Sequence, residues 1–131
     1  MNKINYKETE WFEKDFKKLL KKFRSLEEDL ELVKLATIEP YYIGVVQNNI
    51  LVKKDANAIF LIPNFCNDEL KICKIKKFAC KALKGRGVQS GIRVIYAYHV
   101  LTNTVDFIEM YFKGESENED KERIKEYLSS I

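Results

Sequence analysis

The chain has 131 residues, 46% of them hydrophobic and 12% aromatic, and its formal net charge is +3. These values are typical of one globular domain, residues 1–131, that is large enough to bury its own core. They argue against a membrane protein, because no apolar run approaches the ~20 residues of a membrane-spanning helix. The N-terminal residues lack the apolar segment of a signal peptide, so we expect a cytoplasmic protein.

Two helices are predicted near the N-terminus, after a short strand at residues 5–9. Apolar side chains recur at helical spacing from about Glu10. They are Phe12, Phe16, Leu19 and Phe23. Ser25, followed three residues later by Glu28, is a capping-box pattern and predicts the start of a second helix. That helix should end before Pro40, because proline disfavours helical geometry in the residue preceding it. The two helices should form a hairpin.

Residues 41–70 are the least regular part of the chain. Apolar runs at residues 41–46 and 58–62 predict short strands or loop anchors. Residues 48–49 and 55–57 have the composition of turns.

Three strands are predicted in the second half of the chain, at residues 72–80, 92–100 and 105–112. Alternation in the second strand separates Val94, Tyr96 and Tyr98 from Arg93, Ile95, Ala97 and His99. Alternation in the third separates Ile108, Met110 and Phe112 from Phe107, Glu109 and Tyr111. Because the strands follow one another closely, they should pair as an antiparallel meander.

The local charge becomes negative in the C-terminal part of the chain, where residues 114–120 form an acidic run. Ser116 and Glu119 form a second capping-box pattern, and Ile124, Tyr127 and Leu128 follow at helical spacing. Acidic residues are favoured near a helix N-terminus by the helix dipole. A short C-terminal helix is therefore predicted, and the elements together indicate an α+β fold.

Metal and cofactor chemistry are not expected. The three cysteines, Cys66, Cys73 and Cys80, are seven residues apart, and His99 is the one histidine. Structural zinc sites use Cys or His pairs two to four residues apart, so these are interpreted as buried thiols in a reducing compartment. Gly85-Arg86-Gly87 is not followed by a helical pattern, and no P-loop or hydrolase motif is present.

The charges are distributed unevenly. Residues 71–93 contain eight cations and no acid, which leaves fifteen of the 23 cations against all 20 acids elsewhere, a net of −5. These cations are Lys71, Lys74, Lys76, Lys77, Lys81, Lys84, Arg86 and Arg93. Such a block attracts a polyanion, most often nucleic acid. The alternative is a solvated, lysine-rich strand face.

Metal-free cleavage of RNA is compatible with these residues. The 2′-hydroxyl of RNA can attack its own phosphate if cations stabilise the phosphoryl oxygens and other groups move protons. Lys84, Arg86 and Arg93 lie on two sides of one predicted turn and could converge. The alternative for Arg93 is a cross-strand pair with Glu109, or a side chain that points to water.

Three stretches resemble one known family. Residues 90–96 read S-G-I-R-V-I-Y and are preceded by Lys84 and Arg86; residues 107–113 read F-I-E-M-Y-F-K; and residues 11–19 read W-F-E-K-D-F-K-K-L. In this order they are similar to the RelE/ParE superfamily of toxins from type II toxin–antitoxin pairs. The resemblance spans roughly residues 7–125, with residues 41–70 as a divergent or inserted stretch.

The resemblance implies a RelE-like fold, in which an N-terminal helical hairpin packs on a twisted antiparallel sheet of about four strands, with a short C-terminal helix. It implies a ribosome-dependent mRNA endonuclease that needs no metal or small-molecule cofactor and inhibits translation. Lys84 and Arg86 match the two cations on the strand before the turn, a base candidate and a phosphate clamp. Arg93 matches the arginine that binds the scissile phosphate, and Lys113 the cation at the end of the last strand. RNA backbone would be held by Lys74, Lys76, Lys77 and Lys81.

One departure from the family keeps the enzymatic assignment open. RelE has a tyrosine shortly after the last-strand cation, whereas residues 114–120 contain no aromatic side chain. Candidates for its role in proton transfer are Tyr111, Tyr127, His99 and Glu119. The alternatives to a nuclease are a ParE-like toxin acting on DNA gyrase, or a catalytically weak RNA-binding module of the same fold.

The resemblance also implies partners. These are mRNA on the ribosome and a cognate antitoxin protein that covers the basic face, and no membrane is expected. Acidic side chains of the antitoxin should meet Lys84, Arg86 and Arg93.

Overall fold

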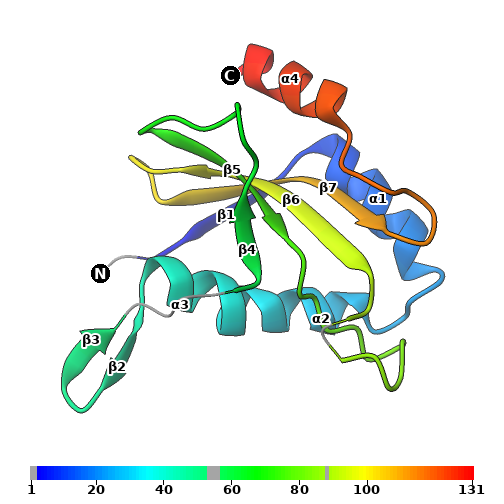
Figure 1. The fold of residues 1–131 in the computed structure, drawn as a ribbon, viewed down its shortest axis with the longest axis horizontal. Helices are drawn as coiled ribbons and strands as arrows, with labels where there is room; N and C mark the ends of the chain where they lie inside the picture. The colour runs from blue at the N-terminus through cyan, green and yellow to red at the C-terminus, as the bar shows by residue number, and fades with distance from the viewer. Residues whose placement is uncertain (1–2, 53–56, 88) are drawn as a thin grey trace.

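The chain folds into a sheet with helices on both faces (Figure 1). The computed structural model describes residues 3–52, 57–87 and 89–131. The strands are β1 (Asn5–Glu8), β2 (Val45–Gln47), β3 (Ile50–Val52), β4 (Ile59–Leu61), β5 (Leu70–Ile75), β6 (Ile92–His99) and β7 (Thr104–Phe112). The helices are α1 (Glu10–Leu20), α2 (Leu26–Val33), the π-helical turn η1 (Lys34–Ile38), α3 (Glu39–Tyr42) and α4 (Lys121–Ser130). The α+β class expected from the sequence is confirmed.

The main sheet is mixed and has five strands, in the order β1-β7-β6-β5-β4. The expected antiparallel sheet of about four strands is therefore wrong in two respects. The first strand, β1, runs parallel to β7, with Asn5 opposite Thr104 and Glu8 opposite Phe107. The short strand β4 adds a further edge beside β5. The strands β5, β6 and β7 form the expected antiparallel meander.

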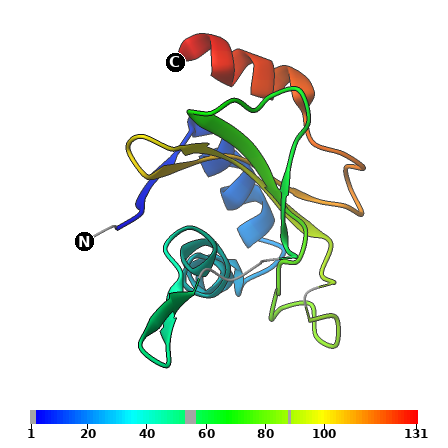
Figure 2. The same ribbon diagram turned by 60° about the vertical axis from the view of Figure 1, so that its left-hand side comes forward.

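The helices from α1 to α3 cover one face of the sheet, and α4 covers the other, as Figure 2 shows for α4 and the α2–α3 segment. Thr9 caps α1 by accepting a hydrogen bond from the Phe12 amide, 3.2 Å. The prediction that the second helix ends before Pro40 is wrong, because the helical segment that starts with α2 runs to Tyr42. The wider π turn η1 precedes Pro40, which lies in the first turn of α3, where proline's missing amide hydrogen costs least.

A β-bulge changes the two faces of β7 from those predicted. The register between β6 and β7 shifts between Ile95 and Tyr96, so that Tyr96 faces Phe107 whereas Ile95 faces Glu109. Ile108 is the extra residue, and it packs toward α4. Met110 and Phe107 instead share the face that packs against α1 and α2. A bulge inverts the alternation that follows it, which strict period-two reasoning cannot anticipate.

Neither predicted capping box forms. The Ser25 side chain makes no capping bond at α2, and α4 is capped by Asp120, which accepts from the Arg123 amide at 3.1 Å. The Asp120 amide in turn donates to buried Glu109, 2.9 Å. Ser25 instead accepts from the distant Ala82 amide, and Glu119 of the second pattern accepts from Lys74.

The region between residues 41 and 70 contributes a hairpin and an edge strand. Strands β2 and β3 pair with each other, separately from the main sheet. The predicted turn at residues 48–49 joins them, and both asparagines have positive φ. Of the predicted turn at residues 55–57, only residue 57 lies within the described residues.

Candidate nucleic-acid interface

The loop between β5 and β6 carries most of the basic block. Strand β5 ends at Ile75, not at residue 80 as predicted, because the chain turns into the core at Phe78, which is fully buried. The buried Ser90 hydroxyl donates to the Phe78 carbonyl and accepts from the Ile92 amide at 3.1 Å. These contacts fix where the loop leaves and re-enters the sheet.

A second anchor ties the middle of this loop to the start of α2. The Ser25 hydroxyl accepts a hydrogen bond from the Ala82 amide at 2.8 Å and donates to the Asp29 carboxylate at 2.7 Å. Asp29, only 1% exposed, also accepts from the Lys81 amide at 3.3 Å. The loop is therefore held to the helical layer by hydrogen bonds from its backbone amides. Its long cationic side chains are not needed to anchor it.

Five cations line one pocket of about 610 Å³ at the end of the sheet. They converge because β5 and β7 end where the antiparallel β6 begins. The loop supplies three of them, β6 supplies one, and one follows β7. They are Lys76, Lys77, Arg86, Arg93 and Lys113.

Arg93 is held by the backbone and not by an acid. One guanidinium nitrogen, Nη1, donates to the Lys76 carbonyl at 2.8 Å and to the Ile92 carbonyl at 3.3 Å. On the neighbouring strand Arg93 faces Tyr111, and Glu109 faces Ile95, so the cross-strand pair with Glu109 does not form. No described residue accepts from Nη2 or Nε of Arg93. An arginine has five N–H donors in a planar fork, so these donors remain available to a ligand.

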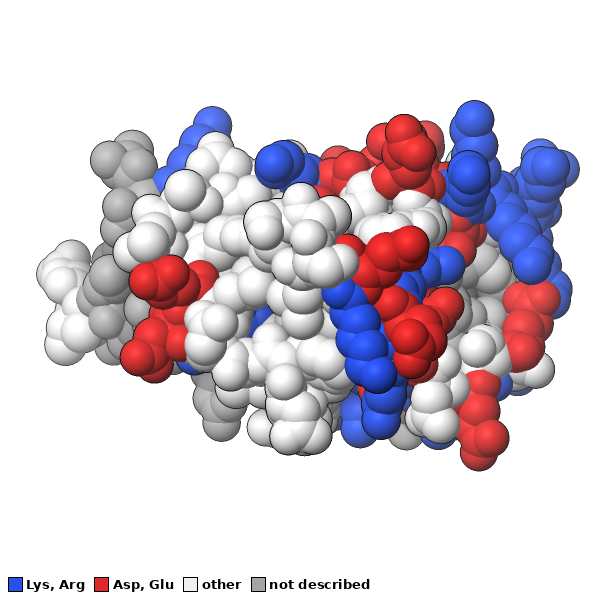
Figure 3. All heavy atoms as spheres, turned by 90° about the horizontal axis from the view of Figure 1, so that it is seen from above, with Lys and Arg blue, Asp and Glu red and all other residues white. Residues whose placement is uncertain are grey.

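The pocket has no acid among the described residues to balance its charge. None of the residues that line it is Asp or Glu. Within the described part of the chain, none of the five cations forms an ion pair, and the Lys76 ammonium instead lies 4.7 Å from the Phe60 ring centroid. The α4 face is different, since acidic side chains stand among the basic ones there (Figure 3). An anion is therefore the natural ligand of this pocket.

Three of the predicted site residues lie outside this pocket. Lys74 projects from β5 to Glu119, with 2.6 Å between Nζ and Oε1. Lys81 forms an exposed ion pair with Glu28, 3.4 Å. Lys84 is exposed and does not line the pocket. The resemblance matches Lys84 and Arg86 to cations on a strand before the turn, but both lie in the loop between β5 and β6.

The groups considered for proton transfer also lie elsewhere. Burial raises the pKa of Tyr111, although Lys74 opposes the shift, and the side chain packs under α4. Tyr127 donates to Asp106 at 2.8 Å and contacts His99 at 2.7 Å; burial and the bond to Asp106 raise its pKa. Glu119 is engaged by Lys74. None of these four residues lines the basic pocket.

Sequence reasoning missed the wall of the pocket formed by Phe112. Its ring lies between two glycines that also line the pocket: a Cβ on Gly91 would be 3.2 Å from Cε1, and a Cβ on Gly114 would be 2.7 Å from Cε2. Gly91 has a φ of +86°, a conformation that side chains disfavour. The signal was present in the sequence as a glycine directly before β6 and another shortly after β7.

No helix in the described part of the chain is both long and apolar enough to cross a bilayer. Among the same residues, no three His, Cys, Asp or Glu side chains are grouped so that they could hold a metal ion. No family model, curated protein or solved structure matches the chain.

Proposed function

We propose that the basic pocket binds the phosphate backbone of RNA, and that the protein is a toxin of the RelE/ParE kind that cleaves mRNA on the ribosome without a metal. The observation that carries this proposal is the convergence of five cations, unpaired with any described acid, on one pocket. Phosphate is the anion that a planar guanidinium and several ammonium groups recognise together.

The order of the elements supports a RelE-like fold as part of this proposal. A strand and a helical layer come first, a three-stranded antiparallel meander follows, and a short helix ends the chain. The residues that carry the resemblance, 90–96 and 107–113, form the two paired strands β6 and β7 with their flanks. Strand β4 and the β2–β3 hairpin are the additions that the divergent stretch 41–70 supplies.

The cleavage step would proceed by attack of the RNA 2′-oxygen on the adjacent phosphorus. A bond to the 2′-oxygen forms, the bond to the 5′-oxygen breaks, and the products are a 2′,3′-cyclic phosphate and a 5′-hydroxyl. Arg93, through its free donors, and Lys113 would stabilise the charge on the phosphoryl oxygens. Proton exchange with the attacking and leaving oxygens would fall to the ammonium groups that line the pocket, Lys76 and Lys77 among them.

A second candidate is an RNA-binding module that does not cleave. It is favoured by one observation: among the described residues, no tyrosine, histidine or carboxylate lines the pocket. Such a protein would keep the phosphate contacts and lack an efficient proton relay.

Inducible expression in translating cells tests the proposal. Wild type, Arg93→Ala, Arg93→Lys and the control Arg24→Ala, an exposed arginine outside the pocket, are followed by growth and by mapping of mRNA 5′ ends. We expect arrest and new cuts within translated frames for wild type and Arg24→Ala, and neither for the Arg93 variants. Arrest without cuts would redirect the proposal to a gyrase-type target. If soluble, folded protein caused neither growth arrest nor new cuts, the non-cleaving RNA-binding module would become the favoured function.

RNA affinity separates binding from cleavage. Five phosphate contacts to a single strand give a slope of about −3.5 in log K against log salt, since each contributes about −0.7. Removing Arg93 should make the slope shallower by about 0.7. A slope that Arg93→Ala leaves unchanged, in a variant of unaltered circular dichroism, would contradict phosphate binding by this residue.

A cognate antitoxin is part of the proposal. Its acidic side chains would cover the basic pocket and meet Arg86 and Arg93, with Lys84 at the margin. Such binding should weaken as salt rises, and an affinity that does not change with salt would contradict a charge-driven cover.

A further inference from the structure

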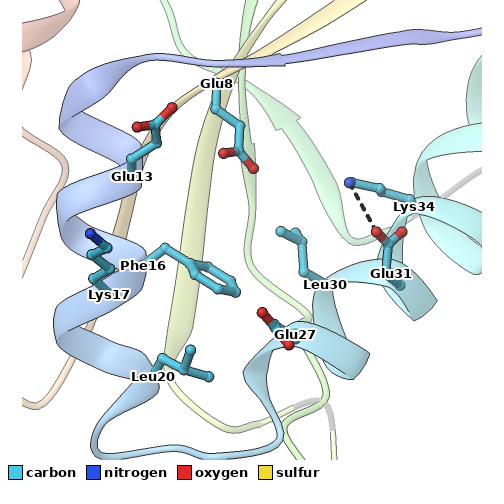
Figure 4. Close-up of a pocket in the computed structure, with 9 residues that line it drawn as sticks. All are labelled: Glu8, Glu13, Phe16, Lys17, Leu20, Glu27, Leu30, Glu31 and Lys34. Atoms are coloured by element: carbon cyan, nitrogen blue, oxygen red, sulfur yellow. Dashed lines mark hydrogen bonds and ion pairs between the residues drawn. The ribbon is translucent and has the colours of Figure 1, made fainter.

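A groove of about 590 Å³ runs between α1 and α2, on the helical layer and away from the basic pocket. Figure 4 shows Phe16 and Leu20 of α1 and Leu30 of α2 pointing into the gap between the two helices. Phe16 and Leu20 are only partly buried, although they pack against the core. The groove therefore has an apolar floor that is not completely covered by the chain itself.

The rim of this groove is acidic. Glu8 and Glu13 stand at one end, and Glu27 stands near the other (Figure 4). Glu31 also lies on the rim but is paired with Lys34 at 3.4 Å. The other three carboxylates form no ion pair with any described residue, and Lys17 is the remaining cation of the lining. The groove thus has the opposite charge to the basic pocket.

The acidic and apolar surface continues around α2. Glu27 and Glu31 also line a neighbouring hollow together with Leu32 and Leu35. These leucines are 48% and 63% exposed, among the most exposed large apolar side chains described. Neighbouring exposed leucines are costly on a free surface and useful on one that receives a partner.

We propose that this groove binds an amphipathic helix of a partner protein, with apolar side chains at i, i+3 or i+4, and i+7 and with Lys or Arg on both flanks. A groove between two helices accepts a third helix, whose apolar anchors fill the floor. The eleven residues of α1 span roughly 16 Å, which matches two to three turns of such a helix. Its cations meet the unpaired rim carboxylates. This inference does not depend on the proposed action on RNA.

A fluorescein-labelled helical peptide with leucines at i, i+4 and i+7 and lysines on both flanks is the probe. Fluorescence anisotropy is measured with wild type, with Glu13→Lys/Glu27→Lys, and with the matched control Glu122→Lys/Glu126→Lys on the exposed face of α4. We expect the groove variant to lose at least tenfold in affinity and the control to stay within twofold. A peptide with glutamates in place of the lysines should bind at least tenfold more weakly to wild type.

Methyl NMR locates the peptide independently of the charge changes. We expect shifts at Leu20 and Leu30 on titration, and an unchanged peptide affinity for Arg93→Ala, which keeps this test separate from the RNA proposal. Absence of binding, equal binding by the groove variant, or shifts elsewhere would overturn the inference. Wild-type dimers that the groove variant abolishes in sedimentation would also overturn it, in favour of a second copy as the occupant.

Discussion

Breaking the ion pair between Lys74 and Glu119 is expected to destabilise the fold by about 2 kcal/mol, because a charge-assisted hydrogen bond between partly buried groups contributes roughly 1.5–3 kcal/mol. Nζ and Oε1 are 2.6 Å apart, and the two side chains are only 14% and 11% exposed. Glu119→Gln leaves the ammonium beside the Tyr111 ring, 6.0 Å from its centroid, without a counter-charge. The pair also ties the acidic segment before α4 to strand β5.

A double-mutant cycle measured by urea unfolding isolates this contribution. The single changes Glu119→Gln and Lys74→Met should each cost about 2 kcal/mol, whereas the double variant should cost about 2.5 kcal/mol instead of about 4. The coupling energy is then about 1.5 kcal/mol. Additive single effects would refute the reasoning, because they would mean that the two groups do not stabilise each other.

The same pair should make stability depend on pH. Burial raises the pKa of Glu119, but the hydrogen bond from Lys74, a backbone hydrogen bond and the positive charges of Lys74 and Lys121 together outweigh burial and hold the pKa below its ordinary value. The stabilisation is therefore complete above the unfolded pKa, about 4.3, and is lost as the pH falls through the lower folded pKa. The stability gap between wild type and Glu119→Gln should be constant from neutral pH to about pH 5 and should close below about pH 4. A gap that persists in strong acid would contradict this assignment.

Three further substitutions test the packing around the site by urea unfolding. Gly91→Ala places a residue with a Cβ at φ = +86°, and this Cβ would lie 3.2 Å from the Phe112 ring. The change should cost about 1–3 kcal/mol. Unchanged stability would argue against the described position of the Phe112 ring. Tyr96→Phe removes the 2.7 Å hydrogen bond between the hydroxyls of Tyr96 and Tyr42 and should cost about 1 kcal/mol. Unchanged stability would show that this bond does not form. Asp29→Ala should cost about 1–3 kcal/mol and speed hydrogen exchange in the loop between β5 and β6, and unchanged exchange would show that the loop is anchored otherwise.

The elements with local patterns could be predicted from the sequence. The apolar positions of α1 repeat every three to four residues, and Phe12 and Leu19 are buried as that spacing indicates. The alternation in β6 also holds, with Val94 and Tyr96 facing α1 and α2 and with Ile95 facing α4. In both cases the signal is contained within one element, because side-chain direction follows directly from backbone geometry.

Features that depend on distant partners could not be predicted in this way. The parallel pairing of β1 with β7 joins residues about a hundred positions apart. Ser25 and Glu119 each have the spacing of a capping box, but the Ser25 hydroxyl accepts from the distant Ala82 amide and Glu119 accepts from Lys74 instead. A capping pattern records only local competition, and a tertiary hydrogen bond of similar strength displaces it.

The candidate site also has features that follow from the local sequence and features that depend on distant residues. Composition and alternation alone indicate that a basic block without acids lies between residues 71 and 93, and that Arg93 belongs to a β-strand. Which cations meet depends on the fold: the end of the sheet gathers Arg93 and Lys113 with three cations of the loop, whereas Lys74 is neutralised by Glu119, an acid 45 positions away. Charge is a property of composition, but whether a charge is free depends on which residues the fold places within a few ångströms of it.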